Sequence, residues 1–184
     1  WSSDVCSSDL VNGELYIVWD DNFPSGPWPA AYTFTIDQAP GTVSILRGAT
    51  PNVSFGEEIL GGLDYDNDGN ADLFVGDIVG DFSLERIGSG SGHLLYNAAT
   101  LAGREIELGA LPVDLRMTTF LGAAARDIAA DTALHGDFDG DGIDDLAFSS
   151  PQADPLARAN AGTVHVFMGK SGGFPALIDL ASPP

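Results

Sequence analysis

The segment LDYDNDGNADL, residues 63–73, carries aspartates at 64, 66 and 68, a glycine at 69 and a further aspartate at 72. A second segment, DFDGDGIDDL at 137–146, repeats this pattern. Carboxylates about 5 Å apart repel one another by roughly 3 kcal/mol per pair at an effective dielectric constant near 20. A folded domain is stable by only about 5–15 kcal/mol. Each segment therefore needs either a cation between its carboxylates or full exposure to water.

The two acidic segments belong to an internal repeat. An offset of 73 residues places the four aspartates, the glycine and the following leucine of the first segment on those of the second. Stretches outside the acidic segments also recur. These are VSILRGA (43–49) with MTTFLGA (117–123), and GELYIVW (13–19) with GHLLYNA (92–98) and GTVHVFM (162–168).

Each repeat is predicted to form about four short strands and no helix. Apolar runs follow both acidic segments, and alternating stretches at 94–96 and 164–167 indicate further strands. Weaker strands are expected at 106–108 and 117–121, and only the Ala-rich stretch 122–133 has a spacing compatible with a helix. Four strands recurring at a long fixed period are typical of a propeller blade, and a closed propeller of four to eight blades needs roughly 300 to 600 residues.

The predicted fold is therefore an all-β, partial β-propeller of about two and a half four-stranded blades. The expected units are an incomplete one at 11–48 and two further ones at 49–122 and 123–184. Residues 1–10, WSSDVCSSDL, are interpreted as non-native, because they correspond to the translation of a sequencing-library adapter, TGG AGT TCA GAC GTG TGC TCT TCC GAT CT. Without them the chain has no cysteine, which excludes disulfides and cysteine catalysis.

The composition is that of a globular, strongly acidic protein. Hydrophobic residues make up 44% of the chain, and 27 acidic against 7 basic residues give a formal net charge of −20. Such a charge disfavours nucleic acid and anionic membrane surfaces as partners. No apolar run approaches the length of a membrane span, so no membrane insertion is expected in this segment.

The stretch FGEEILGGLDYDNDGNADLFVGD, beginning at Phe55-Gly56, resembles the FG-GAP repeat of integrin alpha-subunit propellers and of bacterial surface and secreted proteins. The resemblance extends over most of 11–184. It departs from the family pattern at Gly76-Asp77, where Gly-Ala-Pro is usual, at Ser149-Ser150-Pro151, which keeps only the proline, and at Ile128-Ala129, which replaces Phe-Gly. In the family, loops of this type bind calcium at the bottom of the propeller, and ligands are usually recognised on the opposite face.

The chemistry of the acidic segments also favours calcium. Calcium takes six to eight oxygen ligands in tolerant geometry, and alternate side chains of a curling loop point inward. Glycine at position 6 allows the positive φ of a sharp turn, and position 7 would supply a backbone carbonyl. Two Ca²⁺ sites are therefore predicted, with these ligands: Asp64, Asp66, Asp68, Asn70 and Asp72 in one, and Asp137, Asp139, Asp141, Ile143 and Asp145 in the other.

Other interpretations of the two segments fit less well. An EF-hand needs a glutamate at position 12, where this chain has Val75 and Phe148. Zinc and copper are disfavoured because His135 is the only histidine close to either segment. Magnesium and plain solvated Asp/Gly turns remain alternatives, although two copies in register argue against the latter. Asp144 matches no ligand position, since Ala71 stands at the equivalent place, and is interpreted as a surface acid.

No catalytic set can be assembled from the sequence. GSGSG at 88–92 has Gly90 where a nucleophile elbow needs serine, and MGKSGG at 168–173 lacks the first glycine of a phosphate-binding loop.

The sequence therefore favours a calcium-binding segment of an extracellular, cell-surface or periplasmic binding or adhesion protein, with a protein or glycan ligand on a propeller face. The alternative is the scaffold of a secreted hydrolase or lyase whose catalytic residues lie outside this sequence. Within the chain, the aromatic loop around Trp19, Phe23 and Trp28 is a candidate ligand contact.

Overall fold

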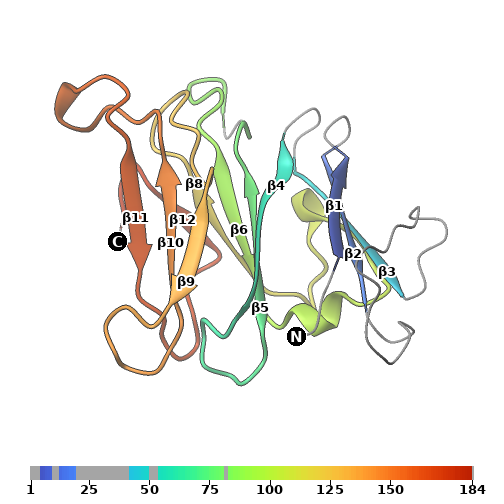
Figure 1. The fold of residues 1–184 in the computed structure, drawn as a ribbon. Helices are drawn as coiled ribbons and strands as arrows, with labels where there is room; N and C mark the ends of the chain where they lie inside the picture. Colours follow the sequence, from blue (N-terminus) through green and yellow to red (C-terminus); the bar gives the residue numbers. More distant parts are fainter. Residues whose placement is uncertain (1–4, 10–12, 20–41, 50–53, 81–82, 184) are drawn as a thin grey trace, which may run out of the picture.

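The computed structural model describes residues 5–9, 13–19, 42–49, 54–80 and 83–183, which form three β-sheets (Figure 1). The first sheet contains, in spatial order, β1 (Val5–Asp9), β2 (Glu14–Val18), β3 (Val43–Arg47) and β7 (Glu105–Glu107). The second contains β12 (Leu177–Asp179), β8 (Met117–Leu121), β6 (Ser91–Leu95), β5 (Asp72–Asp77) and β4 (Phe55–Leu63). The third contains β11 (Thr163–Phe167), β10 (Asp145–Ser150) and β9 (Ala133–Gly136).

The predicted all-β, partial β-propeller is confirmed. Strands β4, β5, β6 and β8 are antiparallel neighbours and form one four-stranded blade, here called the second blade. Strands β9, β10 and β11 form the third blade, and β2 with β3 belongs to the first. The helical elements of the described residues are the 3₁₀ turns Ala98–Leu101, Leu108–Ala110 and Pro155–Ala157. None of the described helices is long and apolar enough to span a membrane.

The second and third blades are each joined to the preceding blade by a short parallel strand. β7 leaves the second blade between β6 and β8 and pairs with β3, with Leu46 opposite Ile106. β12 follows the third blade and pairs with β8 in the same way, with Phe120 opposite Ile178. The expectation that the strand near 106–108 would complete its own blade is therefore wrong. An apolar alternation shows that a strand exists, but the course of the connecting chain decides which sheet edge it joins.

Two hydrophobic cores lie between the blades because side chains alternate across each strand. On β5, Leu73 and Val75 face the first blade, whereas Phe74 faces the third. The core between the first and second blades also includes Leu15, Leu46 and Phe55. The core between the second and third blades is rich in aromatic rings, namely Tyr65, Phe74, Tyr96, Phe120 and Phe148, with Phe167 and Phe174 at its margin.

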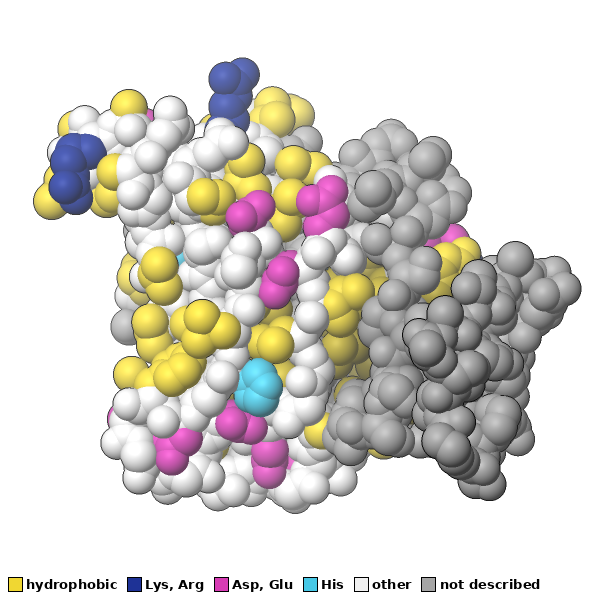
Figure 2. Space-filling view, in the orientation of Figure 1, with side chains coloured by type: hydrophobic (Ala, Val, Ile, Leu, Met, Phe, Trp, Pro, Cys, Tyr) yellow, Lys and Arg dark blue, Asp and Glu magenta, His cyan; other side chains and the backbone are white. Residues whose placement is uncertain are grey.

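The outer face of the third blade exposes hydrophobic side chains that are buried at the equivalent places of the second blade. On the second blade, Tyr65, Leu94 and Tyr96 are 0%, 0% and 5% exposed because the third blade covers them. Phe138, Val166 and Met168, which hold the equivalent places in the third blade by strand register, are 45%, 48% and 46% exposed. Figure 2 shows exposed hydrophobic side chains over this part of the molecule. The described sheets are therefore an open stack of blades.

The Ala-rich stretch 122–133 is not helical. Arg126, Ile128 and Ala130 have φ values of 68°, 55° and 68°, and the backbone bends from residue to residue. Its amide groups bond to neighbouring strand ends, as where the Ala129 N–H donates to the Ser89 carbonyl at 2.9 Å. The chain approaches so closely that a Cβ on Gly90 would lie 2.4 Å from the Ala129 carbonyl oxygen. Tertiary hydrogen bonds thus override the local helix propensity.

Residues 5–9, which the sequence assigns to a non-native leader, form β1 against β2. The edge of a β-sheet presents unpaired N–H and C=O groups to any chain that lies beside it. Pairing at this edge therefore does not discriminate between a native and an added segment.

Candidate metal centres

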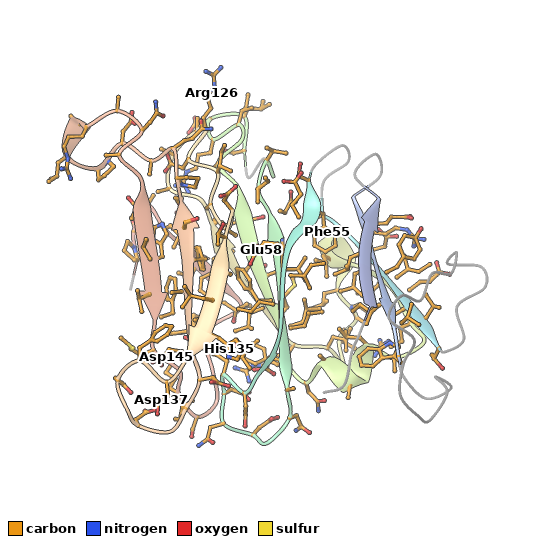
Figure 3. All side chains as sticks on the ribbon, in the orientation of Figure 1. Phe55, Glu58, Arg126, His135, Asp137 and Asp145 are labelled. Atoms are coloured by element: carbon orange, nitrogen blue, oxygen red, sulfur yellow. The ribbon has the colours of Figure 1, made fainter. Side chains whose placement is uncertain are left out.

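Both acidic segments are loops between two strands at the same end of the blades (Figure 1). The first acidic loop, 64–72, begins after Leu63, the last residue of β4, and ends at Asp72, the first residue of β5. The second acidic loop, 137–145, lies in the same way between β9 and β10. Figure 3 shows Asp137 and Asp145 at this lower end and Arg126 at the opposite end. No helix flanks either loop, which agrees with the rejection of an EF-hand.

The backbone of each loop turns at two left-handed residues. Gly69 and Gly142, at position 6, have φ values of +84° and +90°, as the pattern predicts. Position 4 is also left-handed, with Asn67 at 55° and Gly140 at 83°, a feature that was not predicted from the sequence. Position 4 is occupied by an asparagine in the first loop and a glycine in the second. These residue types tolerate the left-handed conformation best, so they could have predicted this turn.

The carboxylates of the first acidic loop converge. Asp64, Asp66 and Asp68 each offer an oxygen, and these oxygens lie within 4.8 Å of one another. The loop holds them from within, because the two oxygens of Asp64 accept the N–H groups of Asp68 and Gly69, both at 3.0 Å. Asn70 donates both its backbone and its side-chain N–H to Asp68 Oδ1, at 2.8 and 3.0 Å. The loop is therefore a preformed cup of carboxylates.

Asp66 is the most constrained carboxylate of this cup. Its side chain is only 6% exposed, and Oδ2 accepts a hydrogen bond from Arg116 Nη1 at 2.8 Å. Oδ1 is buried and has no hydrogen-bond partner among the described residues. Burial raises the pKa of the Asp66 carboxyl, and the neighbouring Asp68 raises it further. A buried carboxylate oxygen without a partner is costly, so this oxygen fits a bound cation.

The second acidic loop gathers a different set. Asp137, Asp139 and Asp145 offer oxygens within 4.8 Å of one another. Asp137 again organises the loop, with Oδ1 accepting N–H groups from Gly140 and Asp141 and Oδ2 accepting that of Gly142. Of the predicted ligands, Asp72 is outside the converging set of its loop, and so is Asp141, whose Oδ1 accepts the Ile143 N–H at 2.8 Å. Asn70 and Ile143, which would supply carbonyls, lie at the last bend of each loop.

The aspartate at position 9 ties each loop to the residue that follows the third strand of its blade, at the same end of the blade. Asp72 is fully buried, and its oxygens accept the N–H groups of Tyr65 at 3.0 Å and Asn97 at 2.8 Å. Asp145 accepts those of Phe138 and Gly169, both at 2.7 Å. Asn97 and Gly169 follow β6 and β11, the third strand of each blade. Position 9 thus joins the loop to the connector that leads to the next strand.

Replacing Asp145 by alanine is expected to lower the free energy of unfolding by about 2 kcal/mol in calcium-free buffer, because two backbone N–H groups lose a charged acceptor. Urea denaturation of the parent and Asp145→Ala chains measures this. Asp139→Ala is the matched control, since Asp139 is exposed and its Oδ1 accepts only the Asp141 N–H. Equal losses in the two variants would contradict the pinning role of position 9.

The comparison with protein-family models gives a match to the FG-GAP repeat over residues 129–167. This span contains β9, the second acidic loop, β10 and β11. This span is similar to that family and is here called the FG-GAP repeat. The resemblance stated from the sequence is confirmed there, and a comparison with curated proteins finds no match. The offset of 73 places this FG-GAP repeat on residues 56–94, which carry the first acidic loop in the same setting.

Asp144 joins the FG-GAP repeat to the first acidic loop and is not the surface acid that the sequence suggested. Its Oδ2 accepts the Asp64 N–H at 3.0 Å, and its Oδ1 lies 3.5 Å from His135 Nδ1. Figure 2 shows acidic side chains beside a histidine at this end of the molecule. Position 8 is occupied by Ala71 in the first loop, so the repeat contained no signal for this role.

A turn at the end of the FG-GAP repeat, here called the covering turn (168–174), closes over the first acidic loop. Its Lys170 and Gly172 N–H groups donate to the carbonyls of Tyr65 at 3.1 Å and Asp66 at 3.2 Å. Tyr65 donates its hydroxyl to the Met168 carbonyl at 3.0 Å. The stretch MGKSGG, which fails as a phosphate-binding loop, therefore serves as an inter-blade contact.

At the opposite end, an open cavity of about 660 Å³ lies between the second and third blades, bordered by Asp127, Asp154 and His165. By strand register His165 is equivalent to His93, which β8 covers through a contact between His93 Nδ1 and Thr119 Oγ1 at 3.2 Å. The cavity therefore borders a histidine that no strand covers in the way β8 covers His93 among the described residues.

The aromatic loop proposed as a ligand contact lies mainly outside the described residues, which include neither Phe23 nor Trp28. Trp19 is described, and it donates its indole N–H to Ser44 Oγ at 2.7 Å while packing on the core between the first and second blades. This tryptophan therefore covers the end of a blade.

Proposed function

We propose that the two acidic loops bind Ca²⁺ and that the chain is the calcium-stabilised propeller segment of an extracellular binding or adhesion protein. The observation that carries the calcium assignment is Asp66 Oδ1, a buried carboxylate oxygen without a hydrogen-bond partner among the described residues, next to Asp64 and Asp68. In the first loop the cation would be held by Asp64, Asp66 and Asp68, with the carbonyl of Asn70. In the second it would be held by Asp137, Asp139 and Asp145, with the carbonyl of Ile143.

The donor set supports calcium over other metals. Every converging group is a carboxylate, which suits a hard cation, whereas zinc and copper prefer nitrogen and sulfur. Among the described residues, His135 lies closest in sequence to an acidic loop. It contacts Asp144 and is not part of either group of converging carboxylates. Magnesium demands strict octahedral geometry and keeps its waters, while calcium accepts the irregular six to eight oxygens that a cup of loop carboxylates and carbonyls provides.

A bound cation would act as a structural fastener. It neutralises carboxylates that are held within 4.8 Å of one another. Each loop is tied through Asp72 or Asp145 to the start of a connector, and the connectors continue into β7 and β12, which bind the preceding blade. Calcium at the loops would therefore stiffen the contacts between blades.

The expected location follows from this requirement. Calcium sites of extracellular modules have dissociation constants of about 10⁻⁴ to 10⁻³ M, so they are filled outside cells and not in the cytosol. The FG-GAP repeat supports a propeller segment of an adhesion-type protein. We place the chain outside the cell, at the cell surface or in the periplasm, with a protein or glycan ligand on a propeller face. Nucleic acid is not proposed as a partner, because the net charge is −20.

Calcium is expected to raise the melting temperature of the chain by about 5 °C or more. At ten times its dissociation constant, each site contributes about 1.4 kcal/mol, and 1 kcal/mol shifts the melting temperature of a domain of this size by roughly 2–4 °C. Differential scanning calorimetry in calcium, in magnesium at the same concentration, and in chelator measures the shift.

The control for this experiment is the double variant Asp64→Asn, Asp137→Asn, which removes the aspartate that organises each loop. It should lose the calcium-specific shift. A shift that magnesium reproduces in full, or that the double variant retains, would rule out the proposed sites.

A further inference from the structure

The two acidic loops differ in their cationic neighbours. Arg116, the residue before β8, forms an ion pair of 2.8 Å with Asp66 in the first loop. Asp139, the counterpart of Asp66 in the second loop, is exposed and bonds within its own loop. Across the described ranges, no lysine or arginine forms an ion pair with a carboxylate of the second loop.

Arg116 is held in place by groups from both blades. Its guanidinium carbon lies 4.0 Å from the centroid of the Tyr96 ring. Its Nη2 donates to the carbonyl of Gly172 and, at 3.4 Å, to that of Phe174, both in the covering turn. The guanidinium therefore ties three parts together: the first acidic loop, the second blade and the covering turn.

A second basic side chain lies close to the first loop. Lys170 Nζ is 4.4 Å from the centroid of the Phe174 ring, and that ring is 5.1 Å from the ring of Tyr65. Two of the seven basic residues of this acidic chain thus gather at one of its two acidic loops. The two loops thus differ in their charged surroundings, although they share the aspartates at positions 1, 3, 5 and 9 and the glycine at position 6.

We propose that Arg116 is a built-in countercharge of the first acidic loop, which makes the two cation sites unequal. This inference rests on the proposed calcium function. The second loop depends on a divalent cation for neutralisation, whereas the first is partly neutralised by Arg116 and binds calcium roughly tenfold more weakly, because a fixed positive charge nearby repels the cation.

Two consequences follow from the geometry. One oxygen of Asp66 is occupied by Arg116, so only Oδ1 is left for the cation. The Arg116 guanidinium also bonds to the covering turn. A cation that displaces this guanidinium from Asp66 would therefore alter the contact between the second and third blades. Calcium at the first loop would then regulate this contact, whereas calcium at the second loop would act through Asp145 and the connector that leads to β12.

Isothermal titration calorimetry with calcium alone tests the proposal on chains in which one loop is silenced. Asp64→Asn leaves the second loop as the binding site, and Asp137→Asn leaves the first. The dissociation constant of the Asp137→Asn chain should be roughly tenfold higher than that of the Asp64→Asn chain. Adding Arg116→Gln to Asp137→Asn should remove most of this difference.

The matched control is Arg104→Gln in the Asp137→Asn background. Arg104 pairs with Asp114 on the surface, at 2.8 Å, so this change alters the net charge equally without touching either loop. It should leave the dissociation constant within about twofold of the Asp137→Asn chain, since the interaction between solvent-exposed charges is weakened by salt.

The outcomes separate the two proposals. Equal dissociation constants at the two loops, or an affinity that Arg116→Gln does not change, would overturn the countercharge while calcium binding stands. Absence of calcium binding in every chain would overturn the proposed function itself. If Arg116→Gln fails to fold, the comparison of Asp64→Asn with Asp137→Asn still decides the inequality of the sites.

Discussion

Replacing Phe120 by alanine is expected to lower the free energy of unfolding by about 4 kcal/mol, the range found for buried phenylalanines. Phe120 is fully buried on β8, at the junction of the second and third blades. Its ring centroid lies 4.7 Å from that of Phe167 and 5.3 Å from that of Phe148, both in the third blade. The cavity left by its removal would therefore open the contact between blades.

Urea denaturation of the parent and Phe120→Ala chains, followed by fluorescence, measures this loss. Phe138→Ala is the control of the same chemistry, because Phe138 is 45% exposed and should cost less than about 1 kcal/mol. Similar costs for the two substitutions would show that the second and third blades do not pack through this aromatic cluster in solution.

Acid is expected to destabilise the chain through His93 by about 3 kcal/mol between pH 7 and pH 4. His93 is 3% exposed on β6, and burial lowers its pKa to about 4. Its ring nitrogens contact Ser91 Oγ and Thr119 Oγ1, both at 3.2 Å. The unfolded chain has the ordinary histidine pKa near 6.5, so it binds more protons than the folded chain between these values. Stability is therefore present above about pH 6.5 and is lost as the pH falls toward 4.

The measurement is the free energy of unfolding of the parent and His93→Gln chains at pH 7 and pH 4.5 in calcium-free buffer. His93→Gln keeps a polar side chain but removes the titrating ring, so its pH dependence should be flatter by about 2 to 3 kcal/mol. His135→Gln is the control, because this histidine is only partly buried and lies at the loop end. A His93→Gln chain with the slope of the parent would refute the assignment.

The fold class was predictable from the sequence because repetition and alternation are local patterns. The offset of 73 residues and the strand-like runs imply stacked all-β units, and the blades of the structure follow them. The destination of β7 was not predictable in this way. Its three residues pair with β3, sixty residues earlier in the chain, and no local pattern encodes which distant edge a short strand will meet.

The acidic loops were predictable for a similar reason. Alternating aspartates with a glycine at position 6 predict a sharply turned loop whose side chains converge. The structure brings three carboxylates together in each loop, with left-handed glycines at Gly69 and Gly142. The separate role of the aspartate at position 9 was not predictable. Asp72 and Asp145 accept hydrogen bonds from the N–H groups of Asn97 and Gly169, which lie more than twenty residues further along the chain.

The sequence by itself determined the repeat, the strand content and the positions of the two acidic loops, because each of these depends on residues close together along the chain. Only the tertiary structure decided that Arg116 faces Asp66, that Asp144 caps the backbone of the other loop, and that β12 fastens one blade to the next. Those contacts join residues from 50 to 80 positions apart. Charge and hydrogen bonding act through space, and their partners are fixed only when the blades have packed.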